Sequence, residues 1–187
     1  MTPPVPRLIH LNGPPGIGKS TLAQLYVDEH PGVLNLDIDQ VRALIGGWQE
    51  HFDEAGELAR PIALAMAGTH LRGGRDVIMP QYLGRIGEIE RFEAAAVDNG
   101  ATFREIVLMD TRERSIERFS RRGDGEELPW HDQIRQVVGQ NGGEALLSQM
   151  YDQLHEVLEL RPSYRVVPSH PGAIRETYEA LRSALDD

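Results

Sequence analysis

The sequence predicts an α/β fold in which a five-stranded parallel sheet is covered by helices on both faces. Short apolar stretches alternate along the chain with segments of helical periodicity, an order typical of parallel strands joined by right-handed crossovers. The chain has 187 residues, of which 40% are hydrophobic, so we expect residues 1–187 to form a single domain. A glycine-rich stretch directly after the first apolar run is the third observation that favours this fold.

Apolar runs bounded by turn residues or charges are predicted to be the strands. They are Leu8–Leu11, Val33–Leu36, Asp76–Met79, Phe103–Met109 and Tyr164–Val167. Nearly continuous apolar runs of this kind are typical of parallel strands that are buried on both faces. Because such sheets bind their ligands beyond the carboxyl ends of the strands, we expect the functional residues in the loops that follow them.

Segments with helical periodicity lie between these strands. They are Ser20–Glu29, Gln40–Ile45, Gly56–Leu71, Ile86–Asp98, Arg112–Arg121, His131–Val138, Glu144–Leu160 and Ala173–Leu185. Pro61 falls near the predicted start of the third helix, where a proline is tolerated. The segment Gly123–Pro129, which separates two predicted helices, is the one candidate for a mobile loop.

The stretch LNGPPGIGKS, residues 11–20, matches the phosphate-binding pattern G-x-x-x-x-G-K-[ST]. Glycine lets bare backbone approach the phosphates, and the helix that follows presents its N-terminus to their charge. Lys19 is expected to reach the β- and γ-phosphates, and the Ser20 hydroxyl is expected to hold Mg²⁺. The residues predicted to bind the nucleotide are Gly13, Pro14, Pro15, Gly16, Ile17, Gly18, Lys19, Ser20 and Thr21. The fold is therefore predicted to be that of a P-loop NTPase, with ATP and Mg²⁺ as cofactors.

Lys19 is the only lysine in a chain with 19 lysine and arginine residues. All the remaining residues of that set are arginine. The compact ammonium group is therefore expected to serve a purpose that a planar guanidinium does not serve.

Composition limits the remaining classes of function. The chain has no cysteine, which excludes disulfides and thiolate metal sites and suits a cytoplasmic protein. No stretch approaches the ~20 apolar residues of a membrane span, so no membrane partner is expected. A net charge of −10 disfavours broad attraction to nucleic acid, although a local basic groove is compatible with it. The sequence does not indicate an oligomeric state.

Asp37, Asp39 and Arg42 follow the second predicted strand. A carboxylate at this edge of the sheet is placed to take a proton from an attacking hydroxyl or to order the water shell of Mg²⁺. The alternative is that Asp39 only caps the short helix predicted to begin at Gln40. Arg42 lies on the same helical face as Asp39, where it either clamps an acceptor, steadies the carboxylate or is simply exposed.

The third and fourth predicted strands end in polar residues with less defined roles. Gln81 stands where many P-loop proteins carry a carboxylate. Asp110 is a candidate ligand for Mg²⁺, but together with Glu113 it also fits a helix N-cap, which we take as the first interpretation.

Arg118, Arg121 and Arg122 close a helix just before the glycine-bearing segment 123–129. Such a segment can fold over a bound nucleotide and bring guanidinium groups to the transferring phosphoryl group. Alternatively, the arginines only complement the helix dipole, which contributes about 0.3–1 kcal/mol each. Three arginines beside a candidate mobile segment favour the catalytic role, so we predict a helical lid over about residues 112–140.

These motifs together resemble the P-loop kinases of small substrates, and especially the kinase module of bacteriophage-type polynucleotide 5′-kinases. In that module an Asp-x-x-Arg pair follows the phosphate loop and a strand, and the pair falls on Asp39 and Arg42 in NLDIDQVR. The resemblance implies that Asp39 is the general base and that Arg42 binds the acceptor. The lid arginine that contacts the ATP phosphates falls on Arg122, with Arg118 one turn earlier. The resemblance covers about residues 7–140 and extends to chloramphenicol phosphotransferase-like and zeta-toxin-like kinases, which also place an aspartate after the second strand.

We therefore expect a phosphotransferase that moves the γ-phosphoryl group of ATP to a hydroxyl of a small-molecule or nucleoside-like acceptor. Lys19 and Ser20 would position the phosphates and the metal, Asp39 would activate the acceptor, Arg42 would orient it, and the lid arginines would stabilise the developing charge. One alternative is a polynucleotide 5′-hydroxyl kinase. A nucleic-acid 5′ end is the less favoured partner, because the chain is acidic. The other alternative is a nucleotide-dependent switch ATPase that phosphorylates no acceptor.

Overall fold

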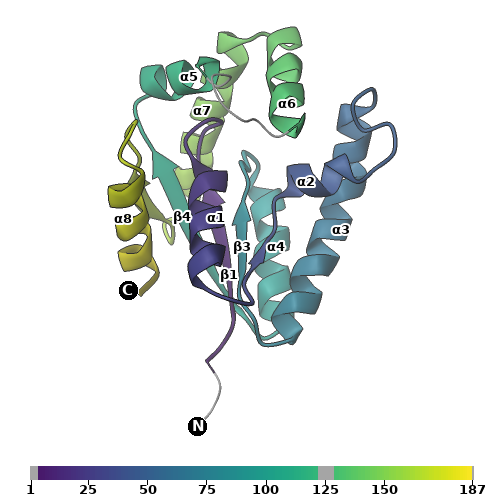
Figure 1. The fold of residues 1–187 in the computed structure, drawn as a ribbon, viewed down its shortest axis with the longest axis vertical. Helices are drawn as coiled ribbons and strands as arrows, with labels where there is room; N and C mark the ends of the chain where they lie inside the picture. The colour runs from purple at the N-terminus through teal and green to yellow at the C-terminus, as the bar shows by residue number, and fades with distance from the viewer. Residues whose placement is uncertain (1–3, 122–128, 187) are drawn as a thin grey trace.

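The computed structural model describes residues 4–121 and 129–186, and its five-stranded sheet is parallel throughout (Figure 1). The strands lie side by side in the order β2-β3-β1-β4-β5. Their bounds are β1 Arg7–Asn12, β2 Leu34–Asn35, β3 Val77–Pro80, β4 Thr102–Met109 and β5 Arg165–Pro168. The predicted α/β fold with a five-stranded parallel sheet is confirmed.

The helices follow the strands in the predicted order. Their bounds are α1 Lys19–Glu29, α2 Ile38–Ala43, α3 Phe52–Arg72, α4 Ile86–Asp98, α5 Arg112–Ser120, α6 Pro129–Gln140, α7 Glu144–Leu160 and α8 Ile174–Asp186. In Figure 1, α5 and α6 lie above the carboxyl ends of the strands, where the sequence predicts a helical lid. Within the described residues, none of these helices combines the length and the apolar character needed to cross a membrane.

Helices cover both faces of the sheet because successive strand residues point to opposite faces. In β1, Leu8 packs into a core with apolar residues of α2, α3 and α4. The next residue, Ile9, packs into a second core with apolar residues of α1 and α8. Since the middle of the sheet is buried on both faces, its strands carry runs of consecutive apolar residues, such as residues 106–108 in β4, rather than a strict alternation.

The strand order places the loop after β1 at the functional edge of the sheet. The chain builds β2 and β3 on one side of β1 and then crosses to build β4 and β5 on the other side. Residues 13–18, which follow β1, therefore lie where the strand order reverses. This switch point is where open α/β sheets bind their ligands.

The start of α2 differs from the prediction, and the cause is a capping aspartate. The helix begins at Ile38 rather than at Gln40 because Asp37 Oδ1 accepts a hydrogen bond from the backbone N of Asp39 at 2.9 Å. Asp39 therefore lies inside the first turn and is not the cap. The capping alternative proposed for Asp39 was wrong, which leaves its carboxylate available for other contacts.

The start of α3 was also predicted wrongly, at Gly56 instead of Phe52. The residue before it, His51, makes no side-chain cap hydrogen bond, so no capping pattern marks the true start. Pro61 consequently lies well inside α3 rather than near its beginning. A proline there removes one helical hydrogen bond, which is why the sequence pattern favoured a later start.

Candidate active site

The loop between β1 and α1 turns through glycines with positive φ: Gly13 at 143°, Gly16 at 83° and Gly18 at 106°. Glycine adopts this region without the steric cost that other residues incur. A Cβ at Gly13 would lie 2.6 Å from the backbone O of Leu108, and one at Gly16 would lie 3.0 Å from the Cα of Phe119. The glycines therefore let the loop lie directly against β4 and α5.

We expect the substitution Gly13→Ala to distort the loop. The neighbouring atom is backbone of β4, so it has little freedom to move away, and the positive φ adds strain. The predicted loss is about 2 kcal/mol or more of unfolding free energy, together with weaker ATP binding, as measured by urea denaturation and calorimetry. Gly46→Ala is the control, because no atom lies within 4 Å of a Cβ built there. Wild-type stability and affinity in Gly13→Ala would contradict the proposed packing.

Lys19, the first residue of α1, folds back across this loop. Its Nζ donates hydrogen bonds to the backbone O of Gly13 at 2.8 Å and to that of Pro14 at 2.9 Å. The side chain is buried, with Lys19 only 9% exposed. A positive charge is thus held inside the curve of the loop, where backbone N–H groups and the helix N-terminus also favour anions.

Asn12, which the sequence analysis did not single out, fixes the start of the loop. Its Oδ1 accepts hydrogen bonds from the backbone N of Gly13 at 2.9 Å and from that of Leu83 at 3.1 Å. Its Nδ2 donates to the backbone O of Leu83 at 3.0 Å. Asn12 is fully buried and ties the phosphate loop to the loop after β3. The one available signal was a polar residue between the first predicted strand and the first glycine of the loop.

Asp39 and Arg42 form the ion pair that their spacing favours. Arg42 Nη1 donates to Asp39 Oδ1 at 2.6 Å, and the guanidinium carbon lies 4.0 Å from the centroid of the Phe52 ring. A Cβ at Gly56 would lie 3.1 Å from Arg42 Nη2, so the glycine makes room for the guanidinium. Contacts from α2 and α3 therefore fix the orientation of Arg42 next to the carboxylate.

Asp37 is buried beside this pair, and burial raises its pKa to about 6. The charge of Asp39 contributes to this rise in pKa, while two backbone hydrogen bonds and the ammonium of Lys19 oppose it. These influences mean that Asp37, Asp39 and Lys19 lie within electrostatic reach of one another. The second strand end and the phosphate loop thus meet at one place.

The raised pKa of Asp37 predicts a pH-dependent stability. Below about pH 4 the carboxyl is protonated in both states, so burial carries no penalty there. Stability falls as the pH rises from about 4 to about 6, because the unfolded chain ionises this carboxyl in water while burial disfavours its charge in the native state. Asp37→Asn keeps a capping side chain and should raise the unfolding free energy at pH 7 on the order of 2 kcal/mol, with little change at pH 4. Urea denaturation at both pH values tests this, and an equal difference at pH 4 and pH 7 would contradict it.

A cavity of about 260 Å³, here called the central cavity, brings the predicted site residues together. Lys19, Ser20, Asp39 and Arg42 all line it, with Asp37 beside them. The facing wall is apolar and comes from α5, α6 and α7, through Phe119, Ile134, Val137, Val138, Leu146 and Met150. The nucleotide loop and the proposed acceptor residues therefore face one space beneath the predicted lid helices.

A second cavity of about 370 Å³, here called the outer cavity, lies on the other side of the phosphate loop. Gly16 and Gly18 line both cavities, so the loop forms their common wall. Thr21 and Arg118, which the sequence analysis assigned to the nucleotide and to catalysis, line the outer cavity and not the central one.

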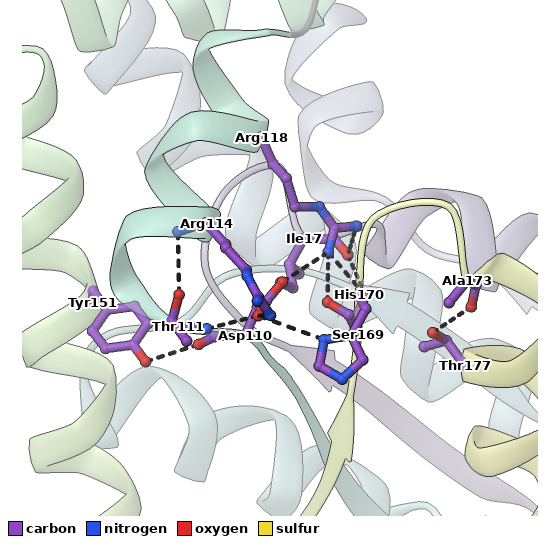
Figure 2. A network of polar contacts seen from close by, with 10 residues as sticks. All are labelled: Ile17, Asp110, Thr111, Arg114, Arg118, Tyr151, Ser169, His170, Ala173 and Thr177. Carbon is purple, nitrogen blue, oxygen red and sulfur yellow. Dashed lines mark hydrogen bonds and ion pairs between the residues drawn. The ribbon is translucent and has the colours of Figure 1, made fainter.

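Arg118 connects the phosphate loop to the loop after β5 (Figure 2). Its guanidinium donates hydrogen bonds to the backbone O of Ile17 at 2.8 Å and to that of Ser169 at 2.6 Å. Ser169 Oγ also donates to the backbone O of Ile17, at 2.9 Å. Ser169 is buried and was not predicted, since nothing in the stretch VPSHPG distinguishes it from an ordinary loop serine.

Asp110 lies at the centre of the network in Figure 2, and its predicted capping role was wrong. Thr111 is the N-cap of α5, and its side chain accepts from the backbone N of Arg114 at 3.3 Å. Asp110 instead lies one residue earlier, and its Oδ1 accepts from the backbone N of Thr111 at 2.8 Å. Nitrogen atoms of Arg114, Arg118 and His170 lie 3.5, 3.9 and 3.6 Å from its carboxylate oxygens. Its carboxylate thus faces the guanidinium groups of Arg114 and Arg118 and the ring of His170, and it is not on the wall of the central cavity.

The predicted cofactor Mg²⁺ needs oxygen ligands from the protein. Within residues 4–121 and 129–186, no group of three or more histidine, aspartate or glutamate side chains is arranged to hold a metal ion. Mg²⁺ in phosphoryl-transfer sites is commonly held by one or two protein oxygens together with phosphates and water. Ser20, Asp37 and Asp39 offer such oxygens to the central cavity, so the residues present fit a nucleotide-bound Mg²⁺.

One predicted catalytic residue is not placed by the structure. Arg122 and the residues up to 128 lie outside the described part of the chain. The role assigned to Arg122 therefore stays a prediction.

Comparison with known proteins supports a P-loop kinase fold. A family model described as "AAA domain" matches residues 8–141. The tunicamycin resistance protein of Deinococcus radiodurans has a similar structure, with a TM-score of 0.62, 17% identity, and coverage of 96% of this chain and 95% of that one. A gluconokinase from Sinorhizobium meliloti 1021 gives a TM-score of 0.60 at 19% identity, with 97% and 95% coverage. A chain of the Pnkp1/Rnl/Hen1 RNA repair complex gives 0.61 at 17% identity, with 83% of this chain and 46% of that one covered. None of the curated proteins matches this chain in sequence.

Proposed function

The chain belongs to the family described as "AAA domain" and has a P-loop kinase-like fold, and on that basis we propose that it is an ATP-dependent phosphotransferase. The proposed acceptor is a hydroxyl group of a small-molecule or nucleoside-like compound. The observation that carries the proposal is that Asp39 and Arg42 line the same cavity as Lys19 and Ser20. A base for the acceptor thus faces the cradle for the donor phosphates.

In this proposal, Lys19 and the backbone N–H groups of the loop hold the β- and γ-phosphates. Asp39 takes the proton of the acceptor hydroxyl while the oxygen of that hydroxyl bonds to the γ-phosphorus. The bond between the γ-phosphorus and the oxygen that bridges it to the β-phosphate breaks, which releases ADP. Arg42, held by its contacts with α3, orients the acceptor and the carboxylate. When bound through the Ser20 hydroxyl and the phosphates, Mg²⁺ would neutralise charge on the transferring group.

The lid arginines are proposed to stabilise the charge that develops on the transferring group. Arg118 is held against Ile17 of the phosphate loop, which supports a position beside the nucleotide. Arg122, four residues further along, is proposed to contact the phosphates directly. The lid would comprise about residues 112–140 of a single kinase domain.

The direct test is transfer of label from γ-³²P-ATP to pooled hydroxyl compounds. We expect labelled product in at least one pool of small molecules. Transfer to 5′-hydroxyl oligonucleotides that improves with length and collapses with added salt would instead indicate a polynucleotide kinase. Release of inorganic phosphate alone, with every pool unlabelled, would indicate a switch ATPase.

A further inference from the structure

A third cavity, of about 470 Å³ and here called the polar cavity, adjoins the central cavity on the side away from the phosphate loop. Arg42, Gln81 and Tyr82 line both cavities. The polar cavity is enclosed by α2, α3 and the loop of residues 81–85 that leads into α4. An acceptor whose hydroxyl group meets Asp39 therefore has room to extend past Arg42 into this space.

The charged side chains around the polar cavity are balanced in sign. They are three arginines and three carboxylates: Arg42, Arg60, Arg85, Asp53, Glu57 and Glu88. A nucleic-acid strand, with one negative charge per nucleotide, would require a clear excess of arginine. A hydroxyl group can donate to a carboxylate and accept from a guanidinium, so a ligand with several hydroxyls suits both kinds of side chain.

Two buried polar atoms on the shared wall have no hydrogen-bond partner in the described part of the chain. They are the donor Nε of Arg42 and the acceptor Oε1 of Gln81. Buried polar atoms without partners are costly, and they are expected to be satisfied by water or by a ligand. A ligand that carries neighbouring hydroxyls supplies both an acceptor for Arg42 and a donor for Gln81.

Arg85 is the cation of the polar cavity with no ion-pair partner among the described residues. Arg60 pairs with Glu57 and lies 3.3 Å from Glu88, and Arg42 pairs with Asp39. Arg85 is exposed and makes no side-chain hydrogen bond as the N-cap residue of α4. Its guanidinium is therefore available to a ligand and is not required to hold the helix.

We propose that the polar cavity binds the body of the acceptor and that the acceptor is a compact polyhydroxylated, sugar-like molecule. This inference rests on the proposed function and adds the class of substrate to it. One hydroxyl loses its proton to Asp39 and bonds to the γ-phosphorus as ADP leaves, while the remaining hydroxyls contact Gln81, Arg85 and the carboxylates of the polar cavity.

The test offers γ-³²P-ATP together with one of three acceptor pools. The first pool contains pentoses, hexoses, their alcohols and their acids. The second contains aliphatic and aromatic monoalcohols, and the third contains 5′-hydroxyl oligothymidylates. We expect at least tenfold more labelled product in the first pool than in either of the others.

The substitution Arg85→Ala then tests whether the polar cavity binds the acceptor, with the polyol from the first pool that received the label as the substrate. It should raise the KM for that polyol about tenfold or more, as expected for the loss of a hydrogen bond from a charged donor, with the KM for ATP unchanged. Arg175→Ala is the matched control, because Arg175 is an exposed arginine in the first turn of α8 and lines none of the three cavities. An unchanged polyol KM in Arg85→Ala would overturn the role of the polar cavity.

Failure of this inference is distinguishable from failure of the proposed function. Label that enters the monoalcohol or oligothymidylate pool in preference to the first pool would overturn the substrate class and leave a kinase. Unlabelled pools throughout, in protein that binds ATP normally by calorimetry, would overturn the proposed function and this inference with it.

Discussion

Replacing Lys19 by alanine is expected to lower ATP-dependent turnover by about 10³-fold or more. The ammonium group is held inside the phosphate loop by the carbonyls of Gly13 and Pro14, and the chain has no other lysine to replace it. Lys19→Arg should fail as well, because a planar guanidinium does not fit the geometry that holds a compact ammonium between two carbonyls. Turnover is measured as ADP release at saturating ATP.

The control for this prediction is Gln24→Ala, which changes an exposed residue on the same helix. Thermal denaturation of each variant separates a loss of catalysis from a loss of fold. If folded Lys19→Ala or Lys19→Arg protein kept turnover near that of the wild type, the loop would not be the phosphate cradle proposed here.

The substitution Asp39→Asn is expected to slow phosphoryl transfer by about 10²- to 10⁴-fold while ATP affinity stays near normal. Asparagine preserves the size of the side chain but cannot take the proton of the acceptor hydroxyl. The helix should survive the change, because Asp37 and not Asp39 caps α2. Single-turnover transfer rates and calorimetric ATP affinities provide the two measurements.

Asp37→Asn distinguishes proton transfer from metal organisation. Asp37 lies in the same cavity but is expected to contribute less to transfer than Asp39. Equal losses in the two variants would point to a shared role in ordering Mg²⁺ and its water. An Asp39→Asn variant with normal transfer would remove the general base from the mechanism.

The features predicted correctly from the sequence are those determined by short-range pattern. The phosphate loop depends on glycines within eight consecutive positions, and the structure gives each of them a positive φ. Asp39 and Arg42 are three positions apart on one helix, so their pairing follows from helical geometry alone. The strands carry runs of consecutive apolar residues, such as residues 77–79 in β3 and 106–109 in β4, which made the sheet recognisable.

The features missed from the sequence depend on contacts between distant parts of the chain. Asn12 bonds Leu83 across 71 positions, and Arg118 bonds Ile17 across 101 and Ser169 across 51. No local pattern marks such partners. The capping errors have a different cause, because neighbouring residues of similar capping propensity differ only in backbone geometry, as Asp37 and Asp39 do.

The most direct test of a phosphoryl transfer to a hydroxyl is ³¹P NMR of the wild-type protein with ATP and the polyol pool. The proposed function predicts a new phosphomonoester resonance that grows in equal amount with ADP and is nearly absent with Asp39→Asn. ADP accompanied only by inorganic phosphate, in the presence of every acceptor pool, would contradict it.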